Sequence, residues 1–183
     1  MERAAELFAE RGVAATSLDE VLGAAGAGKS QMYHYFRSRD ELVAAAVGLR
    51  CAQVLGGLTQ ALGAVASLTE LERALTGFAD GYAQMGLPGC PIGSLAGEVA
   101  ERNEDARLQA AAAFDAWEQL LADALERMRD RGELRADASP AELATALLAS
   151  LEGGMVLSQA RKDPGSLRIA VAAGLAQVRT YLK

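Results

Sequence analysis

A helix-initiation pattern, a serine followed three residues later by a glutamate, recurs along this chain and limits most strongly how it can fold. Pairs with this spacing include Ser17 with Glu20, Ser38 with Glu41, and Ser139 with Glu142. In such a capping box the serine oxygen accepts a hydrogen bond from the third helical N–H, and the glutamate accepts one from the serine N–H. Alanine and leucine dominate the composition, β-branched residues are sparse, and only four prolines occur. This mixture favours helices that pack closely through small side chains, so the sequence predicts an all-α fold.

Apolar spacing and helix-breaking residues predict about nine helices, the first three of them short. Their expected extents are 4–12, 17–26, 29–36, 42–65, a start near Thr69, a start at Ser94, 103–132, 139–158 and 167–182. The stretch MGLPGCPIG at residues 85–93 is the strongest loop signal in the second half of the chain, because its glycines and prolines interrupt a helix.

Charge is distributed unevenly along the chain. The net charge is −6, which taken alone argues against a partner as anionic as DNA. Residues 1–50 carry six Lys or Arg against seven Asp or Glu, whereas the remainder carries twelve against seventeen. Residues 21–39 contain Lys29, Arg37 and Arg39 and no acid at all. The sequence therefore predicts a short cationic face on an otherwise anionic protein.

Several classes of protein are not indicated. No apolar run approaches the roughly 20 residues that span a bilayer, and the start MERAAELFAERG has no signal-peptide pattern, so we expect a soluble, cytoplasmic protein without a membrane partner. Cys51 and Cys90 are far from each other and from His34, the only histidine, which favours neither a zinc site nor a disulfide. No catalytic set can be assembled, so we expect no enzymatic activity, no metal and no cofactor. A solvated helix face is the expected role of the acidic run Glu98, Glu101, Glu104 and Asp105.

Residues 17–36 have the layout of a helix-turn-helix, in which the second helix lies in the major groove of DNA. Gln31 has the donor and acceptor that read adenine, and Lys29 can reach guanine acceptors or a phosphate. Hydroxyl, imidazole and guanidinium groups nearby suit phosphate oxygens. The residues predicted to contact DNA are Thr16, Ser17, Lys29, Ser30, Gln31, Tyr33, His34, Tyr35 and Arg39.

A small core is expected beneath this motif. It is formed by Leu18, Val21, Leu22, Met32 and Phe36. Aromatic residues at helical spacing are more often core than contact, so Phe36 and much of Tyr35 are also expected to be packed.

The stretch TSLDEVLGAAGAGKSQMYHYFRSRDELVAAAV, residues 16–47, resembles the DNA-binding region of the tetracycline-repressor (TetR) family. That region typically contains an AAGVSKGTLY-YF segment before the start of the next helix, and the match covers about residues 4–47. Here Gly28 replaces the Ser or Thr that usually caps the recognition helix, and Ser30-Gln31 replaces the common Gly-Thr. The resemblance implies a dimer with two recognition helices and a divergent helical domain that binds a small molecule.

The resulting expectation is a three-helix DNA-binding domain at 1–45 and a ligand-binding and dimerisation domain at 46–183. The stretch PGCPIGSLAGEVA, residues 88–100, further resembles a TetR subgroup of drug-resistance and flavonoid-responsive repressors, which favours a planar, hydrophobic effector. Residues from at least five expected helices can form its pocket, although ordinary core packing explains each of them equally well. They are Phe78, Tyr82, Met85, Ile92, Leu95, Phe114, Trp117, Leu121, Met128 and Met155.

The last two expected helices, LATALLASLEGGMVLSQA at 143–160 and LRIAVAAGLAQV at 167–178, each carry leucines on one side and small residues on another. The leucine side and the small-residue side of these helices are both covered only if one side packs into the protein core and the other contacts a second subunit. The sequence thus predicts a homodimer through these helices and a palindromic double-stranded operator.

The function expected from these features is that of a ligand-responsive transcriptional repressor. Two alternatives remain open. One is a helical ligand carrier or enzyme that retains a helix-turn-helix-like end. The other is a DNA-binding regulator or activator without a small-molecule effector. The sequence names neither the effector nor the operator.

Overall fold

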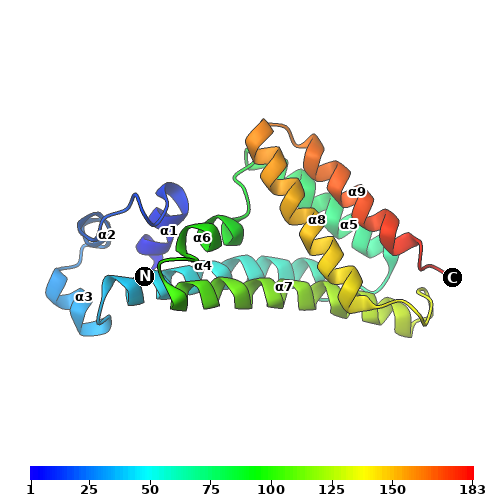
Figure 1. The fold of residues 1–183 in the computed structure, drawn as a ribbon, viewed down its shortest axis with the longest axis horizontal. Helices are drawn as coiled ribbons and strands as arrows, with labels where there is room; N and C mark the ends of the chain where they lie inside the picture. The colour runs from blue at the N-terminus through cyan, green and yellow to red at the C-terminus, as the bar shows by residue number, and fades with distance from the viewer. The chain divides into compact units, whose positions relative to one another are not determined.

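The computed structural model describes residues 1–183 as nine helices joined by loops (Figure 1). The helices are α1 Glu2–Arg11, α2 Leu18–Ala25, α3 Lys29–Tyr35, α4 Arg39–Leu62, α5 Leu68–Gln84, α6 Pro91–Val99, α7 Glu104–Asp130, α8 Pro140–Arg161 and α9 Gly165–Arg179. The only extended pairing is an isolated bridge between Leu134 and Leu182. The prediction of an all-α fold with about nine helices is confirmed.

The three predicted serine caps are present, but only Ser17 and Glu20 form both bonds of a capping box. The Ser17 oxygen accepts from the Glu20 N–H (3.2 Å), and the Glu20 carboxylate accepts from the Ser17 N–H (2.8 Å). The Ser17 backbone and hydroxyl donors favour the charged form of Glu20 and lower its pKa. The oxygen of Ser38 accepts from the next glutamate N–H at 3.1 Å, and that of Ser139 does so at 3.4 Å.

The helix start predicted at Ser94 is wrong. Helix α6 begins at Pro91, so Ser94 lies inside the helix. Proline suits the first turn because its φ is already helical and its missing N–H would have had no partner there. A further cap, which was not predicted, lies at the start of α5, where the Ser67 oxygen accepts from the Glu70 N–H. Ser67 and Glu70 have the same spacing in sequence as the predicted pairs.

Helices α4 and α8 are each long and apolar enough to cross a membrane by length and composition alone. No such segment was expected from the sequence. Arg50 and Glu152 interrupt the two apolar runs. Within the structure, 33% of the apolar window in α4 and 44% of that in α8 are buried. Core helices of soluble proteins pass the same test, so these two helices are weak evidence for a membrane.

The chain folds into two compact units, one of residues 1–55 with 91–114 and the other of residues 56–90 with 115–183. Helices α4 and α7 contribute residues to both units. The two compact units are defined by which residues pack together. Their boundaries differ from the predicted boundary between a DNA-binding and a ligand-binding domain after residue 45. The assignment of DNA binding to residues 1–45 therefore stays a prediction.

The first unit is built on the small helices at its amino-terminal end. Helix α1 packs against α2 and α6 (Figure 1), with Phe8 buried between them and the rest of the unit. The first part of α4 carries the fully buried Val43 and Val47. Gly48 lies beside Gln109 of α7, where an added Cβ would come within 2.9 Å of the Gln109 amide oxygen. These contacts form a core that supports the helices before α4.

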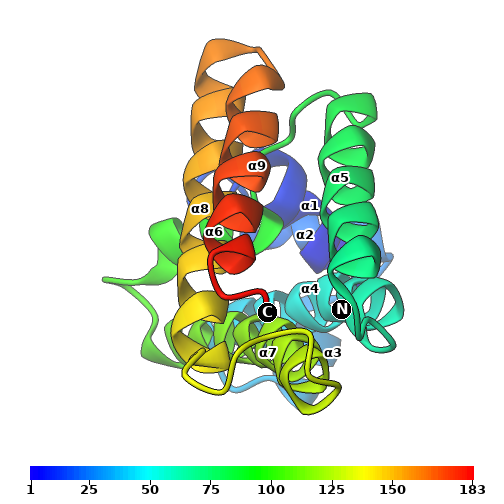
Figure 2. The ribbon, with the colours of Figure 1, turned by 90° about the vertical axis from the view of Figure 1, so that its right-hand side faces the viewer.

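The second unit is a helical bundle in which α8 and α9 form an antiparallel hairpin and α5 packs against α9 (Figure 2). Its core contains fully buried leucines from α5, α7 and α8, including Leu71, Leu121 and Leu151. Arg127 of α7 donates to the carbonyls of Val65 (2.8 Å) and Leu62 (3.2 Å). Since the last carbonyls of a helix have no partner within the helix, Arg127 satisfies the end of α4.

Candidate nucleic-acid interface

Helices α2 and α3 form a helix-turn-helix around Gly26. Gly26 has a left-handed backbone (φ 62°, ψ 29°), which glycine adopts without the steric cost of a Cβ. Its N–H donates to the Gly23 carbonyl (3.2 Å) and the Ala27 N–H donates to the Leu22 carbonyl (3.0 Å), so the end of α2 is satisfied. Gly28 then precedes α3 with an extended backbone (φ −91°, ψ 159°). Three residues thus separate the two helices.

Helix α3 has one buried side and one exposed side. Met32 is buried, as are Val21 and Leu22 of α2, and this part of the predicted small core is confirmed. The exposed residues of the helix are Lys29, Ser30, Gln31, Tyr33, His34 and Tyr35. All six are among the residues predicted to contact DNA. The helix therefore presents polar, aromatic and basic groups to solvent, which a recognition helix requires.

The expectation that Tyr35 is largely packed is wrong, because its side chain is 69% exposed. Tyr35 is the last residue of α3, and its ring meets the His34 ring edge-on with the centroids 5.0 Å apart. Phe36, the next residue, is half-buried, so its predicted packing is only partly present. Tyr35 thus adds to the exposed aromatic surface instead of the core.

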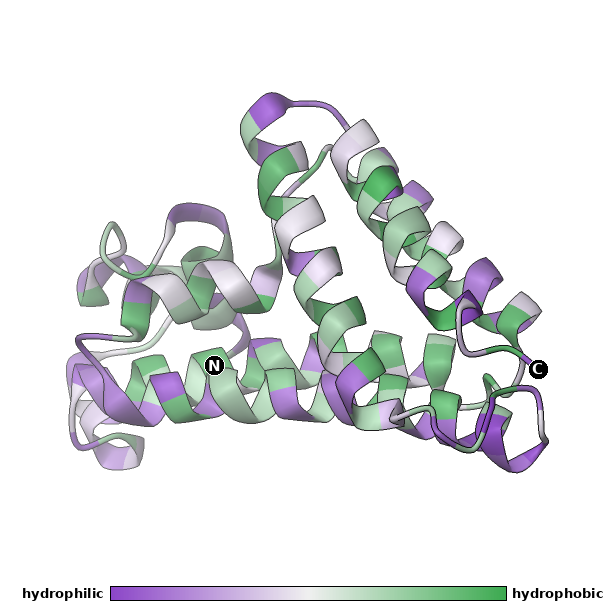
Figure 3. Cartoon of the chain, turned by 45° about the vertical axis from the view of Figure 1, so that its right-hand side comes forward, coloured by the Kyte–Doolittle hydropathy of each residue, from purple (hydrophilic) through white to green (hydrophobic).

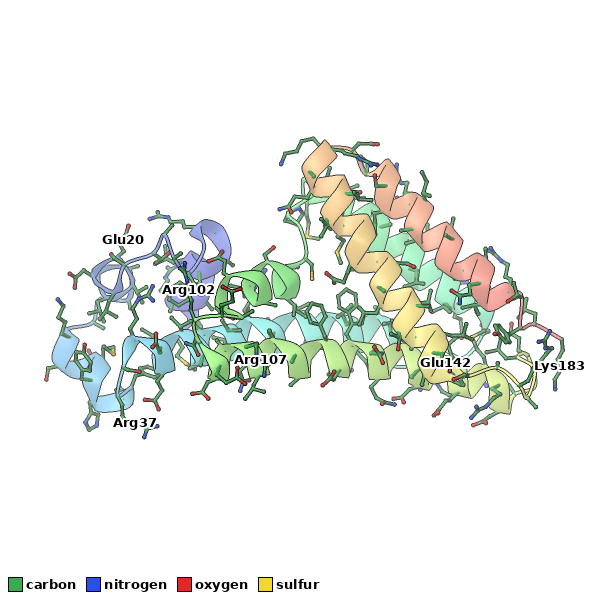
Figure 4. The ribbon with its side chains drawn as sticks, in the orientation of Figure 1. Glu20, Arg37, Arg102, Arg107, Glu142 and Lys183 are labelled. Carbon is green, nitrogen blue, oxygen red and sulfur yellow. The ribbon has the colours of Figure 1, made fainter.

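The basic residues of this region already have acidic neighbours. The Lys29 ammonium lies 2.9 Å from the Asp19 carboxylate of α2, and this hydrogen bond raises the pKa of Lys29. Arg37, which extends away from α3 (Figure 4), bonds the Glu41 carboxylate at 3.2 Å. Both pairs are solvent-exposed and therefore weak, so a phosphate can compete for either cation.

Three residues predicted to contact DNA hold the loop between α1 and α2 in this structure. Thr16 is 1% exposed, and its hydroxyl donates to the Gly12 carbonyl (2.7 Å). The Arg39 guanidinium, at the start of α4, donates to the carbonyls of Val13 (2.8 Å) and Thr16 (2.9 Å). Ser17 caps α2. These bonds position α2, and direct contact of the three side chains with DNA stays a prediction.

Glu98, a residue of helix α6, also holds the loop between α1 and α2. Its carboxylate accepts from the N–H groups of Val13 (2.6 Å) and Ala14 (3.3 Å). Glu98 is exposed, as expected for a solvated acidic face, and it has this additional role in holding the loop. Glu98 and Val13 are 85 positions apart, and no local pattern in the sequence signals such a contact.

The residues predicted to bind an effector lie in both units. Ile92, Leu95 and Phe114 belong to the first, and the other seven belong to the second. In the second unit, the Phe78 and Trp117 rings meet edge-on with centroids 5.9 Å apart. The Tyr82 hydroxyl donates to the Met155 carbonyl (3.0 Å) and accepts from the Gly89 N–H (3.1 Å). The structure thus brings four of the predicted residues into two direct contacts.

Most of the ten predicted effector residues are packed in the structure. The buried members are Tyr82, Ile92, Leu95, Trp117, Leu121, Met128 and Met155, the half-buried ones are Phe78 and Phe114, and Met85 is exposed. A groove of about 310 Å³ lies elsewhere in the second unit, between α5 and α9, and none of the ten lines it. It is lined by Glu72, Thr76, Ala79, Arg168, Val171, Ala172, Leu175 and Arg179.

The missing side-chain cap of α3 gives a testable expectation. Gly28 has a backbone conformation open to any residue, and nothing lies within 4 Å of an added Cβ. Gly28→Ser supplies a cap oxygen and restricts the unfolded chain, so we expect stability to rise by about 0.5 to 1 kcal/mol. Thermal unfolding followed by circular dichroism measures the gain. Gly28→Ala is the control, and an equal gain in both variants would mean that the cap bond does not form.

Comparisons with known proteins cover both parts of the chain. Residues 1–46 match a family described as bacterial regulatory proteins of the tetR family. Residues 67–173 match a family described as the C-terminal domain of LmrA/YxaF-like transcriptional regulators. The transcriptional regulator AcuR of Cereibacter sphaeroides is 29% identical over 87% of this chain and 75% of its own. An uncharacterised HTH-type transcriptional regulator of Mycobacterium tuberculosis is 31% identical over 87% of this chain and 82% of its own.

Solved structures agree with these matches. The regulatory protein TetR from Rhodobacter sphaeroides superposes with a TM-score of 0.78 at 26% identity, over 95% of this chain and 94% of its own. A TetR transcriptional regulator from Chloroflexus aurantiacus gives a TM-score of 0.82 at 25% identity, over 99% and 92%. With an exposed recognition helix, two matching family domains and these relatives, the chain belongs to the TetR family of transcriptional regulators.

Proposed function

We propose that this regulator is a repressor that binds a palindromic operator as a homodimer and is released by a small hydrophobic effector. The observation that carries the proposal is the exposed side of α3, where Lys29, Gln31 and Tyr33 lie opposite the buried Met32. A helix of this kind in a helix-turn-helix places its side chains against base edges and phosphates. The proposal places the protein in the cytoplasm with its DNA, and it includes no catalytic step because the relatives are transcriptional regulators.

The contact between α6 and the loop after α1 offers a route for release. Glu98 binds two N–H groups of that loop, and the loop leads directly into α2. A ligand that favours a displaced α6 therefore also displaces the start of the helix-turn-helix. The segment 86–93 and α6 are the proposed moving element. A coupling of about 1 to 3 kcal/mol between ligand and operator would lower operator affinity by roughly 5- to 150-fold.

Gel shift with and without ligand tests this mechanism. The operator is first selected from random DNA, and candidate hydrophobic ligands are then titrated against the complex. Release of the operator over the concentration range in which the ligand binds the free protein supports the proposal. A ligand that binds tightly and leaves operator affinity unchanged contradicts the release mechanism and favours a regulator without this kind of response.

The exposed apolar side chains of the α8–α9 hairpin support the homodimer. Val156, Leu157 and Ile169 are all exposed, and they lie at the end of the hairpin where α8 passes into α9. Hydrophobic positions do not gather on one face of α8 but occur around it (Figure 3). A helix that is apolar on more than one side needs more than one partner. A second copy of the hairpin supplies the missing one.

Ile169→Asp is expected to separate the subunits. The side chain is 71% exposed in the single chain, so the folded monomer tolerates an aspartate, whereas an apolar interface does not. Sedimentation equilibrium should show a dimer for the unchanged protein and mainly monomer for the variant, with operator affinity reduced in parallel. An unchanged dimer would place the interface elsewhere. Ala172→Ser, at another exposed position of α9, is the control.

A further inference from the structure

Two buried polar atoms of the second unit have no hydrogen-bond partner. One is the indole Nε1 of Trp117, a residue that is 2% exposed, and the other is the carboxyl Oε1 of Glu152. Buried polar groups in native proteins are nearly always paired, because each unpaired group has lost its hydrogen bonds to water. Here a donor on α7 and an acceptor on α8 are both left unsatisfied. A ligand that brings a positive charge to the carboxyl oxygen and a hydrogen-bond acceptor to the indole N–H would compensate both losses.

The face of α5 connects these two atoms. Phe78 and Tyr82 are four residues apart, about 6 Å along the helix axis, and therefore share a face of α5. Phe78 contacts the Trp117 ring. Tyr82 hydrogen-bonds the Met155 carbonyl, one turn of α8 after Glu152, and the charge of Glu152 acts on the Tyr82 hydroxyl. Trp117, Phe78, Tyr82 and Glu152 thus form one continuous cluster, called here the aromatic–carboxyl cluster.

The charge of Glu152 is poorly compensated in this cluster. Burial raises the pKa of Glu152, because the charged form has lost its hydration, and a hydrogen bond with Cys90 offsets this only in part. Burial also raises the pKa of Tyr82, so the phenol stays neutral. Glu152 is half-buried and forms no ion pair. Its carboxyl thus lacks the cation with which a carboxylate withdrawn from water is ordinarily paired.

The segment before Cys90 provides a way in. Leu87 is buried and has a positive φ of 60°, a conformation that costs a residue with a Cβ of order 1 kcal/mol or more. Hydrogen bonds hold the segment to the rest of the unit. They run from the Leu87 N–H to the Tyr82 carbonyl (3.3 Å), from the Gln159 amide to the Pro88 carbonyl (3.0 Å) and from the Gly89 N–H to the Tyr82 hydroxyl (3.1 Å). The strained backbone at Leu87 favours local opening of this segment.

We propose that the aromatic–carboxyl cluster binds a hydrophobic organic ammonium ion that also carries a hydrogen-bond acceptor. The ammonium group pairs with the Glu152 carboxylate, and the acceptor of the ligand accepts a hydrogen bond from the Trp117 indole N–H. The rings of Phe78 and Tyr82 cover the apolar part of the ligand. Aromatic faces add cation–π attraction to the ion pair. That this ligand is also the effector rests on the proposed function, whereas the binding itself does not.

Benzoylcholine and its neutral carbon analogue, 3,3-dimethylbutyl benzoate, form a matched pair of probes. Both carry an aromatic ring and an ester acceptor, and they differ only in a quaternary nitrogen replaced by carbon. Isothermal titration of the full chain should show benzoylcholine binding at least about tenfold more tightly, since its charge adds attraction to the Glu152 carboxylate and cation–π attraction in a desolvated site. Equal affinity for the two probes, or no binding of benzoylcholine, would overturn the proposal without any variant.

Glu152→Gln keeps the shape of the side chain and removes its charge. This variant should lose about tenfold or more in affinity for benzoylcholine and keep its affinity for the neutral analogue. Glu142→Gln, the same change at an exposed position of the same helix (Figure 4), should leave both affinities unchanged. Circular dichroism melting checks that both variants fold. Benzoylcholine affinity that is equal in the unchanged protein and in Glu152→Gln would refute the role of Glu152.

The operator assay separates this proposal from the proposed function. If benzoylcholine binds through Glu152 but does not release the operator, the binding site stands and its role as the effector site is refuted. If an uncharged ligand releases the operator and benzoylcholine does not bind, repression by ligand release stands and the ammonium site is refuted.

Discussion

Replacing Lys29 and Tyr33 together by alanine should lower operator affinity by about two orders of magnitude. Both side chains lie on the exposed side of α3, and neither contributes to the core on which the fold depends. In a dimer the double variant removes two cations and two phenols at once. Loss of two phosphate contacts should also reduce the slope of log affinity against log salt concentration by about 2. Fluorescence anisotropy of a labelled operator at several salt concentrations measures both effects.

Arg73→Ala is the control for this measurement. It removes one cation per subunit from an exposed position of α5, in the second unit. The overall charge therefore changes as it does when Lys29 is removed, but the helix-turn-helix is untouched. Affinity should stay within about threefold of the unchanged protein. If the Lys29 and Tyr33 double variant behaves like Arg73→Ala, helix α3 is not the DNA-reading element.

Gly12→Ala should destabilise the first unit by about 2 to 4 kcal/mol. Gly12 has a backbone conformation (φ 85°, ψ 155°) that is essentially restricted to glycine. An added Cβ would also lie 2.7 Å from a carboxylate oxygen of Glu98, the residue that holds the N–H groups of Val13 and Ala14. Backbone strain and loss of these hydrogen bonds both contribute. Thermal unfolding should shift downward by roughly 5 to 15 °C, and operator affinity should fall with it.

Gly23→Ala is the matched control. Gly23 lies inside α2 with helical backbone, is exposed, and has nothing within 4 Å of an added Cβ. The same substitution there should raise stability by about 0.5 to 1 kcal/mol, because alanine loses less backbone entropy in a helix than glycine. Opposite signs at the two glycines are expected. Similar melting temperatures in both variants would show that Glu98 does not hold the loop as the structure indicates.

Features of the fold that depend on neighbours in sequence could be predicted well. The capping box at Ser17 and Glu20 forms as expected, and Gly26 ends α2 in the conformation that its residue type favours. Proline geometry explains the one misplaced helix start, because α6 begins at Pro91, three residues before the predicted start at Ser94. Local hydrogen bonds of this kind are formed within one helical turn, and the sequence therefore carries their signal directly.

The features of the interface that escaped prediction depend on residues far apart in sequence. Glu98 reaches the loop after α1 across 85 positions, and Arg39 reaches Val13 across 26. Burial in the second unit likewise comes from packing between helices, so the unpaired atoms of Trp117 and Glu152 could be found only in the structure. Helical spacing shows which residues share a face, but it does not show which face another helix covers.

Selection of bound DNA from a random pool by the full chain tests the central claim most directly. Two symmetry-related recognition helices predict an enriched palindrome, with half-sites separated by one DNA turn of about 10 base pairs or a whole multiple of it. The enrichment should be lost in the Lys29 and Tyr33 double variant. Selection of no sequence above background, or of a single unrepeated site bound by one subunit, would contradict the account.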